Sequence, residues 1–294
     1  MATAIFEQPI GQLLKQYKII RLLGEGQTGP VYQARDLVQQ HDVALKVLPL
    51  HLTERPGFSE LFLEAARTAA QLEHPNIVKV LDFGWDHAVP FIVMERLPGE
   101  TLHRLLLALP AQQRWLKLAE AAALTRQIAL AVDYLRRQGP IQRRLQPSDI
   151  MFKPEPSEGL PYRPVLTDLG LANLAAGGLR HTGGSSEPAA YRAPEQAHDS
   201  APDARGDVYA LGVLLHKLAV GQLPSPAAAA PPLTALRPDL PEDLARIIRQ
   251  ALAPDPADRF AGAAELANAL GAVWPALASQ PDRGALSLAA LIRA

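Results

Sequence analysis

Residues 24–31 read GEGQTGPV, and this glycine-rich stretch joins two segments that the sequence predicts to be strands. The first segment, 17–23, and the second, 30–35, both carry β-branched or aromatic side chains. A dinucleotide-binding glycine loop would open a helix, whereas here strand leads to strand. Small residues in such a turn let backbone N–H groups approach an anion. An ordinary hairpin turn explains the same letters, so the interpretation depends on the rest of the chain.

Strands dominate the first part of the chain and helices the second. Three further strands are predicted at 43–48, 77–83 and 90–95, with one helix at 58–72. Later segments divide into predicted helices at 116–138, 207–220 and 241–252, and predicted loops at 153–164, 175–188 and 224–232. Strands followed by helices favour an α+β chain of two lobes, with a boundary near 97–99.

Composition excludes several classes of function. The formal net charge of −1 provides no general attraction for nucleic acid or for an anionic membrane. The chain has no cysteine, which excludes disulfides, thiolate metal sites and cysteine nucleophiles. No apolar run approaches the roughly 20 residues of a membrane span, and 1–9 lack the features of a signal peptide. We therefore expect a cytoplasmic protein with no nucleic-acid partner and no membrane segment within this chain.

Five more motifs accompany the glycine loop in a fixed order. They are VALK at 43–46, HPNIV at 74–78, DLG at 168–170, APE at 193–195 and DVYALG at 207–212. Together they resemble the protein Ser/Thr kinase family, especially its bacterial branch. The resemblance implies a bilobal protein-kinase fold, with a small antiparallel-sheet lobe that holds one regulatory helix and a larger helical lobe. The expected parts are an N-terminal extension at 1–16, lobes at 17–97 and 98–273, and a C-terminal tail at 274–294.

The resemblance implies that the phosphate-binding half of an ATP site is retained. Gly24, Gly26 and Gly29 correspond to the loop that covers the phosphates in this family. Lys46 corresponds to the strand lysine that pairs with the phosphates. Asp168 corresponds to the aspartate that binds Mg²⁺, with leucine replacing the usual phenylalanine after it. ATP with Mg²⁺ is therefore the expected ligand.

The adenine-binding residues follow from the same resemblance. Val31, Ala44 and Met151 correspond to the side chains that enclose the base. The backbone from Glu95 to Leu97 corresponds to the segment that hydrogen-bonds its edge. Core packing is the alternative explanation for each apolar side chain, and both roles can hold together.

The residues that transfer the phosphoryl group are replaced. Active members of the family read HRDLKPxN in the catalytic loop, whereas residues 142–149 read QRRLQPSD. Arg144 replaces the aspartate that accepts the proton of the substrate hydroxyl, and a guanidinium stays protonated. Gln146 replaces a lysine, and Asp149 replaces the asparagine that holds the second Mg²⁺. Since a carboxylate also binds magnesium, Asp149 and Asp168 are the candidate metal ligands.

Two further family residues are missing, while one pairing is kept. The regulatory helix has Ala65 where the family has the glutamate that pairs with the strand lysine. The neighbouring Glu64 is about 100° away around the helix and should face elsewhere. Pro188 replaces a threonine that hydrogen-bonds the catalytic aspartate and lysine. In contrast, Arg259 and Glu195 are both retained and are expected to form an ion pair.

The C-terminal tail, 274–294, lies past the resemblance. Its apolar side chains, such as Leu288 and Leu291, could dock on a partner, but we expect a frayed terminal helix.

Three functions remain open. The first is a pseudokinase, meaning a nucleotide-binding regulatory module whose occupancy sets the affinity for a protein partner, such as an active kinase or another signalling protein. The second is an active or weakly active protein Ser/Thr kinase, because phosphoryl transfer depends on positioning more than on covalent chemistry. The third is a nucleotide-free scaffold in which Lys46 pairs with Asp168. All three interpretations take into account that the chain lacks an intact set of catalytic residues.

Overall fold

The computed structural model describes residues 10–26, 29–49, 52–54, 56–107, 115–138, 145–169, 190–198, 203–225, 231–281 and 284–293. These residues form two compact units. Unit 1 contains the described residues up to Leu97 together with Asp168 and Leu169, and unit 2 contains the others. Within the described ranges, every helix is too short or too polar to cross a membrane.

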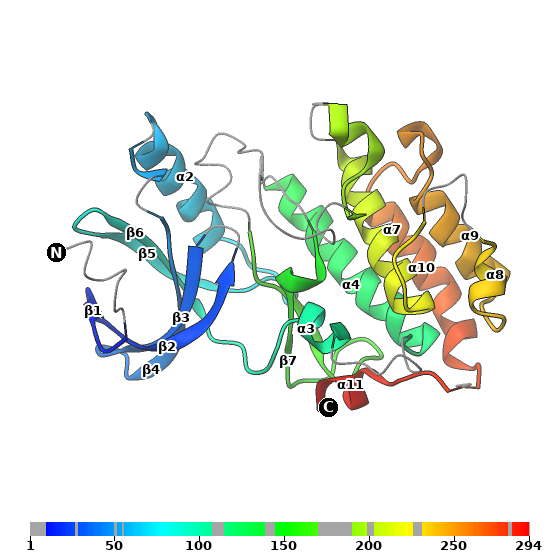
Figure 1. The fold of residues 1–294 in the computed structure, drawn as a ribbon, viewed down its shortest axis with the longest axis horizontal. Coiled ribbons are helices and arrows are strands. Elements are labelled where there is room, and N and C mark those ends of the chain that lie inside the picture. The colour runs from blue at the N-terminus through cyan, green and yellow to red at the C-terminus, as the bar shows by residue number, and fades with distance from the viewer. Residues whose placement is uncertain are drawn as a thin grey trace. The chain divides into compact units, whose positions relative to one another are not determined.

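Unit 1 is built on an antiparallel sheet. Its strands are β1 (Leu13–Leu14), β2 (Tyr17–Gly26), β3 (Gly29–Asp36), β4 (His41–Val47), β5 (Val80–Asp86) and β6 (Val89–Glu95). Among the described residues their spatial order is β1-β2-β3-β4-β6-β5, and Figure 1 labels all of these strands. The expected strand at 77–83 begins later, at Val80, because Ile77 and Val78 are buried without joining the ladder. The other four expected strands are confirmed.

One face of this sheet forms the core of unit 1. Val43, Leu45 and Val47 alternate along β4 and are at most 1% exposed. They contribute to a cluster with Leu14, Tyr17, Ile19, Tyr32, Ala34, Val89, Phe91 and Val93. Since successive side chains of a strand point to opposite faces, Ala44 and Lys46 lie on the other face.

The helix of unit 1, α2 (Phe58–Ala70), packs beside β5. Its buried side chains recur with helical spacing: Phe58, Phe62, Ala65, Ala66 and Ala69. The rings of Phe58 and Phe62 both meet the indole of Trp85 edge to face. These contacts determine which side of α2 faces the sheet.

Unit 2 is mainly helical. Its helices are α3 (Leu102–Leu107), α4 (Leu118–Arg137), α7 (Ala204–Val220), α8 (Leu233–Leu236), α9 (Glu242–Ala251), α10 (Ala263–Ala278) and α11 (Leu288–Arg293). Figure 1 shows α4, α7 and α10 side by side, and all three pairs are in contact. The predicted helices at 116–138, 207–220 and 241–252 correspond to α4, α7 and α9. Expected loop residues 175–188 lie outside the described part of the chain.

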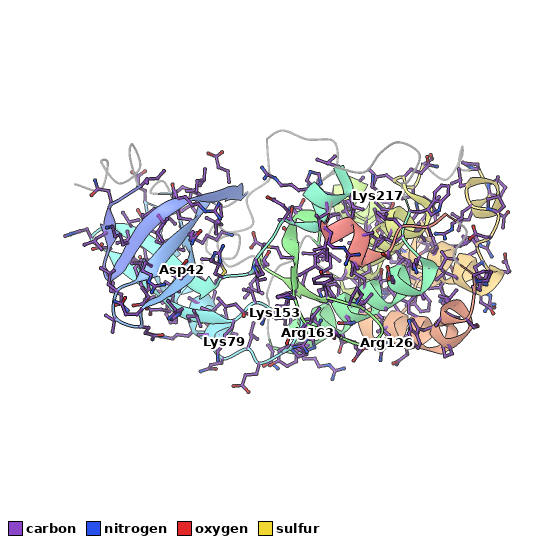
Figure 2. The ribbon with its side chains drawn as sticks, turned by 90° about the horizontal axis from the view of Figure 1, so that it is seen from below. Asp42, Lys79, Arg126, Lys153, Arg163 and Lys217 are labelled. Carbon is purple, nitrogen blue, oxygen red and sulfur yellow. The ribbon has the colours of Figure 1, made fainter. Side chains whose placement is uncertain are left out.

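The segment 153–164 is a loop as expected, apart from end residues that belong to strands. A hairpin of β7 (Ile150–Lys153) and β8 (Arg163–Leu166) brings Lys153 opposite Arg163, and Figure 2 labels both residues. Between the strands, Ser157 exchanges hydrogen bonds with Gln127 of α4, at 3.0 Å in each direction. The composition predicted this loop but did not predict its contact with α4.

The expectation of a frayed C-terminal helix is wrong. Leu286 exchanges backbone hydrogen bonds with the chain before α4, from its N–H to the Trp115 carbonyl and from the Lys117 N–H to its own carbonyl. After this bridge, α11 contacts α3, as Figure 1 shows. Its side chains Leu288 and Leu291 are 0% and 1% exposed. Burial of these two leucines holds the segment in place.

Candidate functional site

The glycine stretch forms the end of the β2–β3 hairpin. Gly24 pairs with Val31, and Gly26 pairs with Gly29. The backbone φ of Gly29 is +126°, and a Cβ added there would lie 2.2 Å from the carbonyl oxygen of Val47. Only glycine fits this position. The predicted strand–turn–strand context is confirmed, while Gln27 and Thr28 lie outside the described residues.

Lys46 lies on the face of the sheet that the apolar core leaves open. Its cross-strand partners are Val31 on β3 and Ile92 on β6. Ala44, two residues earlier, pairs with Met94 in the same way. Paired residues share a face, so Val31, Ala44 and Lys46 are brought together as the sequence predicted.

The Lys46 ammonium is paired with Asp168. Nζ of Lys46 donates to Oδ2 of Asp168 at 3.0 Å, and the two side chains are 9% and 28% exposed. Both residues belong to unit 1. This ion pair places a cation suited to phosphate beside a carboxylate suited to a metal ion.

The regulatory helix, α2, has no acidic side chain directed toward Lys46. Ala65 is buried on α2, whereas Glu60 and Glu64 are exposed. Glu64 therefore faces solvent, as the helical spacing predicts. In the described part of the chain, Asp168 is the one acidic residue within ion-pairing distance of Lys46.

The end of β6 carries the backbone that the resemblance assigns to the adenine edge. There the Glu95 carboxylate accepts a hydrogen bond from the Lys79 N–H at 2.9 Å, and the Glu95 N–H donates to the Lys79 carbonyl at 2.9 Å. Leu97, two residues later, is 8% exposed. The contacts with Lys79 and the burial of Leu97 hold this part of the backbone in place.

In unit 2, Gln146 precedes a single turn of 3₁₀ helix, Pro147–Asp149. The Asp149 carboxylate accepts hydrogen bonds from the Gln146 N–H at 3.2 Å, from Gln146 Nε2 at 3.4 Å and from Ser148 Oγ at 3.2 Å. The backbone carbonyl oxygen of Asp149 accepts two further hydrogen bonds, from the N–H and from the hydroxyl of Thr167. The turn is thus fixed by its own side chains.

Buried neighbours anchor the same turn on both sides. Leu145 and Ile150 are 6% and 0% exposed. Met151 follows on β7 and is half-buried opposite Val165. The contributions of Ser148 and Thr167 were not predicted, although a serine beside a carboxylate is a sequence signal for such a bond. Arg144 and Pro188 lie outside the described residues.

The expected pairing of Arg259 with Glu195 is confirmed. Nη1 and Nη2 of Arg259 donate to the two carboxylate oxygens of Glu195, each at 2.8 Å. The Arg259 guanidinium holds the pKa of the Glu195 carboxyl below its usual range. Since the arginine side chain is 0% exposed, this pair ties the 3₁₀ turn Pro194–His198 to the segment before α10.

The described residues contain no cluster of three or more His, Asp or Glu side chains that could hold a metal ion by themselves. Magnesium normally uses one or two carboxylates together with substrate phosphates, so a larger protein cluster is not required.

Comparison with known proteins identifies the family. A model of the protein kinase domain matches residues 17–270. The serine/threonine-protein kinase pkn3 of Myxococcus xanthus is 33% identical, over 99% of this chain and 56% of its own length. PknJ of Mycobacterium tuberculosis is also 33% identical, over 90% of this chain and 46% of its own length. This chain spans about half the length of these curated relatives.

A solved structure agrees with these relatives. The PknI kinase domain of Mycobacterium tuberculosis superimposes with a TM-score of 0.68 at 29% identity, covering 89% of this chain and 98% of that chain. The expected fold class, an antiparallel-sheet lobe with a helical lobe, is confirmed. The chain belongs to the protein kinase family.

Proposed function

We propose that this chain is a nucleotide-binding regulatory module, a pseudokinase whose phosphotransfer is absent or severely impaired. The observation that carries the proposal is Arg144, which stands in the sequence position of the catalytic base. Leu145 and Gln146 follow it and lead into the turn that Asp149 closes. A guanidinium cannot accept the proton of a substrate hydroxyl, since it stays protonated in proteins.

The ATP-binding half of the proposal rests on unit 1. Lys46 and the glycine-rich hairpin of β2 and β3 together suit a triphosphate, because small residues in such a turn let backbone N–H groups approach an anion. The buried position of Lys46 strengthens its attraction for an anion, because water screens it less. The residues present therefore fit a nucleotide. When bound, ATP would supply the charge that these groups recognise, and its occupancy would set the affinity for a protein partner in the cytoplasm.

The test combines binding with transfer. ATP with magnesium, at about 100 times its dissociation constant, should raise the free energy of unfolding by about 2.7 kcal/mol. Lys46→Ala should reduce that gain. Transfer of labelled phosphate to a basic protein, or to the chain itself, should not exceed the level of an Asp168→Ala blank.

Two alternatives have specific support. The names of the relatives, serine/threonine-protein kinases, favour an active or slow kinase, and labelled transfer above the blank would establish it. The Lys46–Asp168 ion pair favours a nucleotide-free scaffold. A melting temperature that millimolar ATP leaves unchanged would support the scaffold.

A further inference from the structure

The two candidate metal ligands are each bonded to donors of their own unit. Asp168 accepts from the Lys46 ammonium at 3.0 Å. Asp149 accepts from the backbone and side chain of Gln146 and from Ser148. A magnesium ion demands near-ideal octahedral oxygens and loses its waters reluctantly. To use these carboxylates it would have to compete with donors that are already in place.

The bond between Lys46 and Asp168 is a consequence of the sequence of α2. The stacked rings of Phe58 and Phe62, held against Trp85, set the rotation of this helix. That rotation turns Ala65 inward and leaves Glu64 in solvent. A buried lysine needs a partner for its charge. With no acid on the inner side of α2, Asp168 supplies it.

The charge balance then differs from that of a site built for magnesium. A lysine paired with a helix glutamate leaves Asp168 as an uncompensated anion, which attracts a divalent cation. Here one N–H of the Lys46 ammonium is directed to Asp168, across 3.0 Å and with the lysine side chain only 9% exposed, and its other donors remain for an anion. Asp168 therefore attracts a divalent cation less strongly than an aspartate without a cationic partner would.

We propose that this chain recognises a nucleoside triphosphate without a divalent cation, with Lys46 providing the charge and Asp168 positioning Lys46. The inference rests on the proposed nucleotide binding and specifies its chemistry. Magnesium competes with Lys46 for Asp168 and does not help the nucleotide to bind. Magnesium therefore changes the affinity for the nucleotide by a factor close to one, whereas coupled ligands typically change each other's affinity about 5- to 150-fold.

The experiment measures the affinity of the whole chain for ATP by calorimetry, once with excess EDTA and once with millimolar magnesium, at constant ionic strength. We expect dissociation constants that agree within about threefold, below the usual range of coupling. Binding that requires magnesium would overturn this inference but leave the proposed nucleotide binding intact. Binding in neither condition would overturn both.

Two substitutions sharpen the test. Asp168→Asn removes the carboxylate that a metal needs but keeps a hydrogen-bond acceptor for Lys46, so ATP binding in EDTA should persist. Asp168→Ala removes the acceptor as well and should weaken ATP binding in EDTA, so equal ATP affinity in the two variants would contradict the positioning role. Ala65→Glu gives Lys46 a second carboxylate partner and should release Asp168, so magnesium should then increase the ATP affinity by at least about fivefold.

Ala70→Glu is the matched control for Ala65→Glu. It adds the same side chain at an exposed position of the same helix. Magnesium should have no effect on ATP affinity in this variant. An equal gain in both variants would show that general charge, and not the pairing of Lys46, determines the response to the metal.

Discussion

Arg259 and Glu195 are joined by two parallel hydrogen bonds of 2.8 Å although they are 64 residues apart in the chain. The guanidinium also donates to the carbonyl oxygens of Ala253, Arg205 and Pro254 and lies over the ring of Tyr209. All of its donors are directed into unit 2. The bidentate geometry makes this pair stronger than a single ionic contact.

Removing one partner of this pair should destabilise unit 2. Glu195→Gln leaves the fully buried Arg259 charge without its anion, and we expect a loss of about 3 kcal/mol in the free energy of unfolding. Urea denaturation measures it. Glu100→Gln, in the exposed pair with Arg104, is the control and should be nearly neutral. Equal effects in the two variants would show that burial does not govern the contribution of the pair.

His216 makes stability depend on pH. Burial lowers the pKa of this imidazole, although its hydrogen bond to the Gln222 carbonyl opposes the shift. The folded chain thus keeps it neutral, whereas the unfolded chain takes up a proton near pH 6.5, so the free energy of unfolding should decrease from about pH 7.5 to about pH 5.5.

The variant His216→Gln tests this origin. It removes the titrating group, so the decrease over this range should become smaller. His87→Gln, at an exposed position, controls for the loss of an imidazole. An unchanged pH dependence in His216→Gln would exclude His216 as its source.

Local sequence patterns predicted the elements that repeat with a regular period. The alternation of Val43, Leu45 and Val47 indicated a half-buried strand, and β4 is that strand. These local patterns did not predict the burial of side chains that pack against a distant segment of the chain. Leu288 and Leu291 form too short a run to indicate a docked helix, and their burial depends on α3.

The candidate site shows the same limit. The family resemblance identified Lys46 and Asp168 separately, and it raised their pairing only as one of three functional interpretations. Helical spacing correctly predicted that Glu64 faces away from Lys46, but it did not predict the contacts of Phe58 and Phe62 with Trp85 that set this rotation of α2. Such ring contacts between a helix and a strand are not visible in the helix sequence alone.

Gly29 should tolerate no side chain. Its φ of +126° is unfavourable for other residues, and an added Cβ would meet the Val47 carbonyl oxygen. Gly29→Ala should therefore cost about 1–3 kcal/mol of stability and weaken ATP binding. Thermal melting and calorimetry measure the two effects. Gly24→Ala is the matched control, because a Cβ added at Gly24 would meet no atom within 4 Å, and this variant should melt like the parent chain.

The docking of α11 predicts a stability loss at the C-terminal end. Leu288→Ala removes a fully buried side chain and should cost about 2–4 kcal/mol, as large-to-small changes in a core do. Arg293→Ala, at an exposed position of the same helix, should be neutral. A neutral result for Leu288→Ala in chemical denaturation would mean that the segment does not stay docked in solution.

Restoring the catalytic base alone should not restore phosphotransfer. Arg144→Asp recreates the residue that the family uses, but Ala65, Gln146 and Pro188 still differ from it. Catalytic groups that act as a unit are strongly non-additive, so the first loss removes most of the rate and later losses cost little. Reversing any single loss consequently recovers little.

The structure adds a physical reason for this expectation. Without a glutamate at position 65, Lys46 stays bonded to Asp168 at 3.0 Å, and the Asp168 carboxylate is engaged by the lysine instead of by a metal ion. With Gln146 in place, the Asp149 carboxylate keeps its bonds to the turn. We therefore expect transfer only when Ala65→Glu, Arg144→Asp, Gln146→Lys, Asp149→Asn and Pro188→Thr are combined. The assay follows labelled phosphate from ATP to a basic protein, with Asp168→Ala as the blank. Robust turnover by the single variant Arg144→Asp would refute the argument, because it would show that the remaining substitutions leave a competent site.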